Sequence, residues 1–301
     1  MSKPFNIVSE NYGEWGFGIV DPLIQRTFPN VSITHDQTSK PDLVIRSHFY
    51  QPDNPQPYSC PYITWSGESF PVNPKPNEPS ILDINTFYPP EGGEQSNNSD
   101  FSKSLYFPHL LTDCISMQRP SFIQPKKYCA SYAFSVSVLE RENLFRKLRE
   151  LEPTCYSFGQ SLHTSDNPFE LPRNQRQQNA EKFGSFGFNV AMENKIVKGY
   201  LTEKIGYAFK AGSVPIYWGD TSIVNDFFNK DAFVNVLDYS SVEKCAENVV
   251  EIWRDSQKYE KFISAPLTIS KTLEDYQCWQ TEYRPWQKLF VDRLREAYPD
   301  L

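Results

Sequence analysis

The sequence predicts an α/β protein built from two Rossmann-like domains, and three observations support this. Its 301 residues are enough for two domains of ordinary size, each with its own core. From Tyr128 onward, strand-like apolar runs alternate with helix-like segments, which is typical of a parallel sheet with helices on both faces. The first 120 or so residues carry short β-type runs between proline-rich polar loops, which indicates a less regular α/β domain.

In the first domain we expect short strands with apolar, β-branched composition at 5–9, 42–47, 62–65 and 81–87. We also expect a helix to start at Asp21-Pro22, because proline is favoured at the first helical position. The segment 117–127, with two prolines and two lysines, is the best candidate for a boundary. The predicted domains are therefore residues 1–122 and 123–280.

In the second domain, helical periodicity predicts helices over 140–151, 202–211 and 241–255. The helix at 202–211 places Leu201, Ile205, Ala208 and Phe209 on one face, with Gly212 as a C-terminal cap. A last helix near 284–297 follows the completed second domain. We therefore expect residues 281–301 to cross back and pack at the junction of the two domains.

The amino-acid composition limits the kinds of partner that the protein is expected to bind. The net charge of −7 and the absence of Lys/Arg-rich runs argue against binding to nucleic acid. No stretch approaches the roughly 20 apolar residues of a membrane span, and the first residues lack the apolar core of a signal peptide. Six scattered cysteines without a CxxC pair do not suggest a disulfide framework or a zinc site. We expect a cytoplasmic protein, monomeric or weakly dimeric.

The most informative stretch is residues 188–220, which reads as strand, loop, helix and strand. Ligands of open parallel sheets bind beyond the carboxyl ends of the strands, where helices begin. Lys204 in the first turn of the helix opposes the helix dipole, which suggests a bound anion, and Glu203 suits the hydroxyls of a ribose. The alternative is an ordinary helix start, with Thr202 as its cap and a solvated lysine. Spacing and polarity alone indicate no more than a nucleotide site. The polar side chains in this zone are Glu193, Asn194, Tyr200, Thr202, Glu203 and Lys204.

The run 188–219, followed by 228–239, closely resembles the donor-binding region of the α-1,3/1,4-fucosyltransferase family. The shared pattern is a Glu-Asn pair, a short loop, Tyr-x-Thr-Glu-Lys, and a strand exit with Val-Pro-x-x-x-Gly. The resemblance implies an inverting GT-B enzyme that uses GDP-fucose as donor. It implies that Asn194 and Tyr200 contact the donor, with Glu203 on the ribose side and Lys204 near the pyrophosphate.

Upstream, the segment 140–148 resembles the family's helix whose arginine holds the pyrophosphate, and Arg141 is the matching position. A guanidinium suits this role because it binds phosphate oxygens in pairs and stays charged. Arg146 is a competing candidate on the same predicted helix. A solvated helix surface remains the alternative for both arginines.

In the first domain, the segment 63–73 resembles the family's strand-Gly-Glu element, and Glu68 matches the catalytic base. Displacement at the anomeric carbon needs a base that takes the acceptor's hydroxyl proton while GDP leaves on the opposite face. Gly67 allows the backbone to turn sharply before Glu68. His48 ends a predicted strand and could line the acceptor cleft, although a structural or surface role is the simpler interpretation.

No Asp-x-Asp occurs in the chain, and this is the arrangement with which metal-dependent sugar transferases hold a divalent ion on a diphosphate. We therefore expect no metal and no other cofactor. The predicted reaction moves L-fucose from GDP-fucose to a hydroxyl, expected to be O3 or O4 of GlcNAc or glucose, of a glycan bound by the first domain. The alternatives are another GDP-sugar as donor, or a glycan-binding relative without activity.

Overall fold

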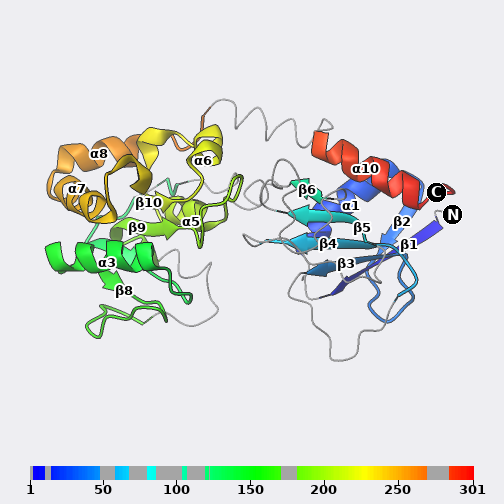
Figure 1. Ribbon diagram of the computed structural model, residues 1–301, viewed down its shortest axis with the longest axis horizontal. Coiled ribbons are helices and arrows are strands. Elements are labelled where there is room, and N and C mark those ends of the chain that lie inside the picture. Colours follow the sequence, from blue (N-terminus) through cyan, green and yellow to red (C-terminus); the bar gives the residue numbers. More distant parts are fainter. Residues whose placement is uncertain are drawn as a thin grey trace. The chain divides into compact units, whose positions relative to one another are not determined.

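The computed structural model describes residues 3–10, 15–47, 58–67, 80–85, 104–106, 119–121, 123–170, 182–269 and 285–301. The chain divides into two compact units (Figure 1). Unit 1 comprises Met1–Pro108 and Cys278–Leu301, and unit 2 comprises His109–Gln277. The last helix therefore belongs to the unit formed by the N-terminal residues. The boundary predicted at residue 122 lies further along the chain than the division at Pro108.

Unit 1 contains a six-stranded parallel sheet in the order β2-β1-β3-β4-β5-β6. Its elements are β1 (Lys3–Glu10), α1 (Trp15–Thr27), β2 (Val31–Thr34), β3 (Leu43–Ser47), β4 (Tyr62–Ser66), β5 (Ser80–Asn85), β6 (Ser104–Tyr106) and α10 (Pro285–Ala297). The four predicted strands correspond to β1, β3, β4 and β5. The sequence analysis did not predict β2 and β6, which are short.

The prediction that a helix starts at Asp21-Pro22 is wrong, because α1 begins at Trp15 and contains Pro22 in its interior. A proline inside a helix offers no N–H to the carbonyl four residues earlier, which weakens the helix locally. Burial of Val20, Leu23 and Ile24 in the unit 1 core opposes that cost. Tertiary packing thus extends the helix on the N-terminal side of the proline.

The final helix, α10, packs against α1, β5 and β6 (Figure 1). Its Phe290 and Leu294 are buried in the same core cluster as Phe5 on β1. After the helix, the Tyr298 hydroxyl donates to the carbonyl of Asp42 at 2.5 Å. Burial of two such large apolar side chains contributes about 3–6 kcal/mol, so α10 is an integral part of unit 1.

Unit 2 contains a five-stranded sheet in the order β11-β10-β9-β7-β8, and its recorded pairings are parallel. Its elements include β7 (Tyr128–Tyr132), α3 (Leu139–Leu151), β8 (Tyr156–Ser157), β9 (Phe186–Met192), α5 (Lys204–Lys210), β10 (Val214–Trp218), α6 (Thr221–Phe227), α7 (Val242–Arg254) and α8 (Ser256–Ser264). Two short 3-10 helices, η2 (Lys230–Ala232) and η3 (Val236–Asp238), flank β11 (Val234–Asn235).

Helices cover both faces of the unit 2 sheet, as the alternating pattern predicted. Alternate residues of β9, namely Phe188, Val190 and Met192, join the core cluster that includes α3 and α7. Alternate residues of a strand point to opposite faces, and α5 contacts β9 and β10 with side chains that lie outside that cluster. Gly212 has a φ of 67°, which confirms its predicted position as a cap after α5.

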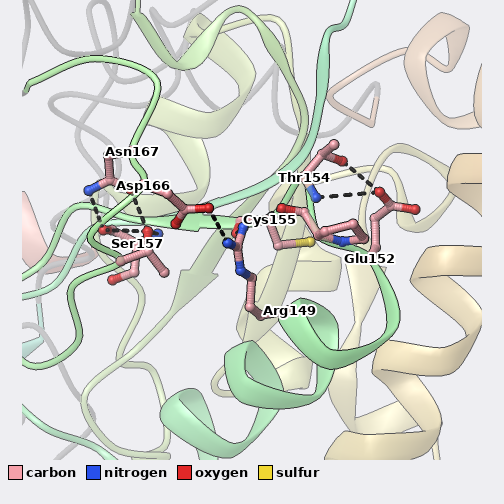
Figure 2. A network of polar contacts seen from close by, with 9 residues as sticks. Arg149, Glu152, Thr154, Cys155, Ser157, Asp166 and Asn167 are labelled. Atoms are coloured by element: carbon pink, nitrogen blue, oxygen red, sulfur yellow. Dashed lines mark hydrogen bonds and ion pairs between the residues drawn. The ribbon is translucent and has the colours of Figure 1, made fainter.

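A polar network fastens the edge strand β8 to its surroundings (Figure 2). Arg149 of α3 donates to the carbonyl of Cys155 at 2.8 Å and pairs with Asp166 at 2.5 Å. Asn167 in turn donates to the carbonyl of Ser157 at 2.8 Å. These bonds hold the loop after β8 against the end of α3, so the strand's two residues do not depend on ladder bonds alone.

Four cysteines in the described part of the chain, Cys60, Cys129, Cys155 and Cys245, are buried free thiols. They pack among apolar neighbours, where a thiol behaves as a small hydrophobic group.

Candidate functional site

The candidate site lies at the carboxyl end of β9, on the loop that leads into α5. Glu193 continues β9 by one residue, since its N–H donates to the carbonyl of Trp218 at 2.8 Å. The loop then turns at Gly199, whose φ of 83° is disfavoured for other residues. The Gly199 N–H donates to Asp220 at 2.6 Å, which ties the loop to the start of α6. This is the end of the sheet at which the sequence predicts a ligand site.

Glu193 is completely buried, yet its carboxylate is well satisfied. It accepts the backbone N–H of Thr202 at 2.8 Å, and the Thr202 hydroxyl lies 2.9 and 2.8 Å from its two oxygens. The ammonium of Lys204 is 2.9 Å from Oε2. A buried carboxylate is tolerated when it is hydrogen-bonded and paired in this way.

Lys204 therefore has a partner inside the protein, which also explains why a lysine occupies the first turn of α5. Its ammonium donates to Glu193 and, at 2.8 Å, to the Thr202 hydroxyl. Burial opposes the charged form, but Glu193 and Glu203 outweigh it and raise the pKa of Lys204. The sequence analysis explained this lysine by a bound anion, whereas the buried carboxylate is sufficient.

Thr202 was predicted to cap α5, and this is wrong. The N-cap residue is Glu203, which has helical dihedral angles and makes no side-chain capping bond. The Thr202 hydroxyl is instead taken up by Glu193 and Lys204. A capping residue and a loop residue that bonds a buried carboxylate look alike in sequence, because both are short hydroxyl side chains before a helix.

Arg141 reaches the same cluster from α3. Its Nη2 donates to the carbonyl of Glu193 and to Oδ1 of Asn194, each at 2.8 Å. Its guanidinium carbon lies 3.7 Å from the centroid of the Phe134 ring. The residue is fully buried, burial lowers the pKa of Arg141, and its Nε has no hydrogen-bond partner among the described residues. An unsatisfied buried donor on a cation is costly, so a functional reason is expected.

Arg146, the competing arginine, does not join this group. Its side chain is 56% exposed and pairs with Glu142 at 2.8 Å on the outer part of α3. The geometry therefore brings Arg141, and not Arg146, to the end of β9. We refer below to Arg141, Glu193, Asn194, Thr202 and Lys204 as the Glu193 cluster.

The two remaining predicted donor residues flank this cluster. Tyr200 is almost completely buried, and its N–H donates to the carbonyl of Val197 at 2.9 Å. Glu203 is partly exposed at the start of α5. The partly exposed position of Glu203 suits a group that meets a ligand, and the buried position of Tyr200 suits one that supports the loop.

In unit 1, the predicted base Glu68 and the cleft candidate His48 lie outside the described residues. Gly67 directly follows β4 and is partly exposed. β3 and β4 are adjacent and parallel, with Ser47 paired to Trp65. β3 and β4 therefore end at the same edge of the sheet, where ligands of open parallel sheets bind.

Sequence reasoning missed a buried ion pair near that edge. Nε of Arg46 in β3 lies 2.6 Å from Oε2 of Glu10 in β1, and both side chains are less than 10% exposed. The Arg46 guanidinium also lies 4.5 Å from the ring centroid of Tyr62. The signal available in the sequence was a charged residue near the end of each of two apolar strands. Phe134, which lies beside Arg141, was likewise missed because it reads as one more apolar strand residue.

The described residues contain no group of three or more His, Cys, Asp or Glu side chains arranged to hold a metal ion. None of the helices in the described ranges combines the length and the apolar character needed to cross a bilayer.

The fold and the location of the site define a class. Over its full length the chain is similar to the crystal structure of an α1,3-fucosyltransferase, with a TM-score of 0.61, 17% sequence identity and 92% of that chain covered. A second structure, of an α1,3-fucosyltransferase with GDP-fucose, aligns with a TM-score of 0.53 and 18% identity over 95% of this chain and 93% of the other. The protein is thus an α/β protein of the GT-B type with two parallel sheets.

The sequence comparison narrows the class to one family. The model of the family "Glycosyltransferase family 10 (fucosyltransferase) C-term" matches residues 123–289, and the chain belongs to this family. An α-(1,3)-fucosyltransferase of Helicobacter pylori is 37% identical over 109 residues, which are 36% of this chain and 21% of the relative. The chain spans no more than about a third of the length of the curated relatives it matches.

Proposed function

We propose that this protein transfers L-fucose from GDP-fucose, with inversion and without a metal ion, to a hydroxyl of a glycan. The expected position is O3 or O4 of GlcNAc or glucose. The observation that carries the proposal is the Glu193 cluster, which joins two cations at the carboxyl end of β9 within the region that matches the family. A solved structure with the same fold is named for its complex with GDP-fucose, which supports the choice of donor.

In this proposal, unit 2 binds the donor. Arg141 and Lys204 stabilise the negative charge that develops on GDP as the bond to fucose breaks. Two of the three N–H groups of Lys204 donate within the cluster, which leaves one for a phosphate oxygen. Arg141 is fully buried, so its unpaired Nε–H meets a phosphate oxygen only when a covering group moves aside. Glu203 accepts hydrogen bonds from the ribose hydroxyls.

Unit 1 binds the acceptor. Glu68 takes the proton of the attacking hydroxyl as that oxygen bonds to the anomeric carbon and GDP departs from the opposite face. With positive charge supplied by side chains, the reaction needs no divalent ion on the diphosphate.

The test is a transfer assay with GDP-fucose and an array of glycan acceptors, read by product mass and linkage analysis. Parallel reactions with GDP-mannose and UDP-galactose examine the donor, and a chelator examines the need for metal. NMR coupling at the new anomeric centre reports the configuration. Fucosylated product of inverted configuration in chelator is the expected result. Transfer only from another donor, or binding of glycans without release of GDP, overturns the proposal.

A further inference from the structure

Glu193 is shared by both candidate phosphate-binding cations. Its backbone carbonyl accepts from Arg141 at 2.8 Å, and its carboxylate lies 2.9 Å from the Lys204 ammonium. Arg141 comes from α3 and Lys204 from α5, on opposite sides of this residue in sequence. One residue at the end of β9 therefore connects two helices that each supply one positive charge.

The carboxylate of Glu193 is poorly placed to touch a donor itself. It is fully buried, and its oxygens are occupied by the backbone and hydroxyl of Thr202 and by Lys204. A negative charge beside a diphosphate is also unfavourable on its own account. Any contribution of Glu193 to donor binding must therefore come through the groups to which it is hydrogen-bonded.

We propose that Glu193 is a positioning residue for the donor's diphosphate, aligning Arg141 through its carbonyl and Lys204 through its carboxylate. This inference rests on the proposed function, because it assumes that the diphosphate binds at these two cations. The carboxylate acts in two ways. It fixes the direction of the Lys204 side chain, and it keeps that side chain protonated although most of it is removed from solvent.

The second effect distinguishes positioning by charge from simple structural support. Among the described residues, the charged groups that act on Lys204 are Glu193 at the end of β9, Glu203 beside it and Arg141 from α3. Burial and Arg141 favour the neutral amine, whereas the two glutamates favour the ammonium. Replacing Glu193 by glutamine removes one of the two opposing charges, so Lys204 loses its proton at a lower pH than in the parent protein.

The experiment measures the affinity for GDP by calorimetry from about pH 7.5 to about pH 10, in the parent protein and in Glu193→Gln. The ratio of the two affinities is used, because the titration of GDP itself then cancels. We expect the ratio to grow with pH by on the order of tenfold, since deprotonated Lys204 no longer attracts phosphate. The matched control is Glu247→Gln, which breaks an exposed Lys–Glu pair with Lys244, and its ratio stays near one at every pH.

The possible outcomes distinguish a failure of the proposed function from a failure of the proposed role of Glu193. Failure of the parent protein to bind GDP overturns the proposed function and this inference together. Binding of GDP by the parent, with a Glu193→Gln ratio that is constant across the pH range, overturns the inference alone, because a merely structural defect weakens binding equally at each pH.

A second variant covers the case in which Glu193→Gln does not fold, which its melting temperature reports. Thr202→Val removes the hydroxyl that bonds both Glu193 and Lys204 but leaves the carboxylate in place. We expect a smaller rise of the affinity ratio with pH, of about two- to threefold, because the ion pair loses only its bridging group. No pH-dependent change in Thr202→Val likewise overturns the inference.

Discussion

Replacing Arg141 by methionine separates the structural role of this residue from its proposed role in donor binding. The change deletes the two short hydrogen bonds from a charged donor, to the Glu193 carbonyl and to Asn194, each worth about 1.5–3 kcal/mol, and a longer one of 3.5 Å to the Val136 carbonyl. It also deletes the contact with the Phe134 ring, worth about 2 kcal/mol when desolvated. Methionine avoids the cost of burying a cation, which cancels part of this loss.

We expect a net loss of about 3 kcal/mol in the stability of unit 2, which lowers its melting temperature by about 6–12 °C. Binding of GDP should weaken about 100-fold, because a charge-assisted contact to phosphate of about 2.7 kcal/mol is lost. Scanning calorimetry without ligand gives the first quantity. Titration calorimetry with GDP, at a temperature where the variant is folded, gives the second.

Arg146→Met is the matched control on the same helix. Its side chain is 56% exposed, and the pair with Glu142 contributes only about 0.3–0.5 kcal/mol. The control should leave both melting temperature and GDP affinity almost unchanged. A greater loss of GDP affinity in Arg146→Met than in Arg141→Met would show that the pyrophosphate has been assigned to the wrong arginine.

Three further predictions concern other parts of the chain. Glu68→Gln should reduce transfer at least 100-fold while GDP-fucose affinity stays within about twofold, and substantial turnover in this variant would remove Glu68 from the mechanism. Burial and Arg119 lower the pKa of Lys126 to about 8, below its value in the unfolded chain, so Lys126 makes stability rise as pH increases above about 8. Lys126→Met should abolish this pH-dependent contribution to the free energy of unfolding, measured with urea between about pH 7.5 and about pH 9. An unchanged pH dependence in the variant contradicts this prediction. Gly187→Ala should cost about 1–3 kcal/mol, because a Cβ there would lie 2.6 Å from the Trp253 ring, and an unchanged melting temperature would show that the ring moves freely.

Much of the fold was predictable because the local signals are strong. The amphipathic pattern over 241–255 predicted α7, whose Ala246, Val249 and Val250 are buried. The strand, loop and helix order of residues 188–220 also corresponds to β9, α5 and β10. These elements depend on side-chain periodicity and caps, which act over a few residues.

The start of α1 was not predictable from the same rules. Proline favours the first position of a helix, yet Pro22 lies inside α1. The helix extends past it because Val20, Leu23 and Ile24 are buried on either side, and such burial depends on strands distant in the chain.

The candidate site was likewise predictable from the sequence in part only. Local sequence predicted a phosphate site at the end of β9 and selected the polar residues around it, since a strand that ends in Glu-Asn before a helix start is a local pattern. Only the tertiary structure could choose between Arg141 and Arg146. The two lie on one helix, and the choice depends on which side faces the sheet.

The partner of Lys204 was also decided in three dimensions. Glu193 and Lys204 are 11 residues apart, and the loop that turns at Gly199 brings their side chains within 2.9 Å. Sequence spacing conveys charge and order along the chain, but it conveys neither the direction of a loop nor the burial of a carboxylate. The direction of this loop and the burial of the Glu193 carboxylate arise from packing among β9, α3 and α5. Together they give Lys204 its partner and its raised pKa.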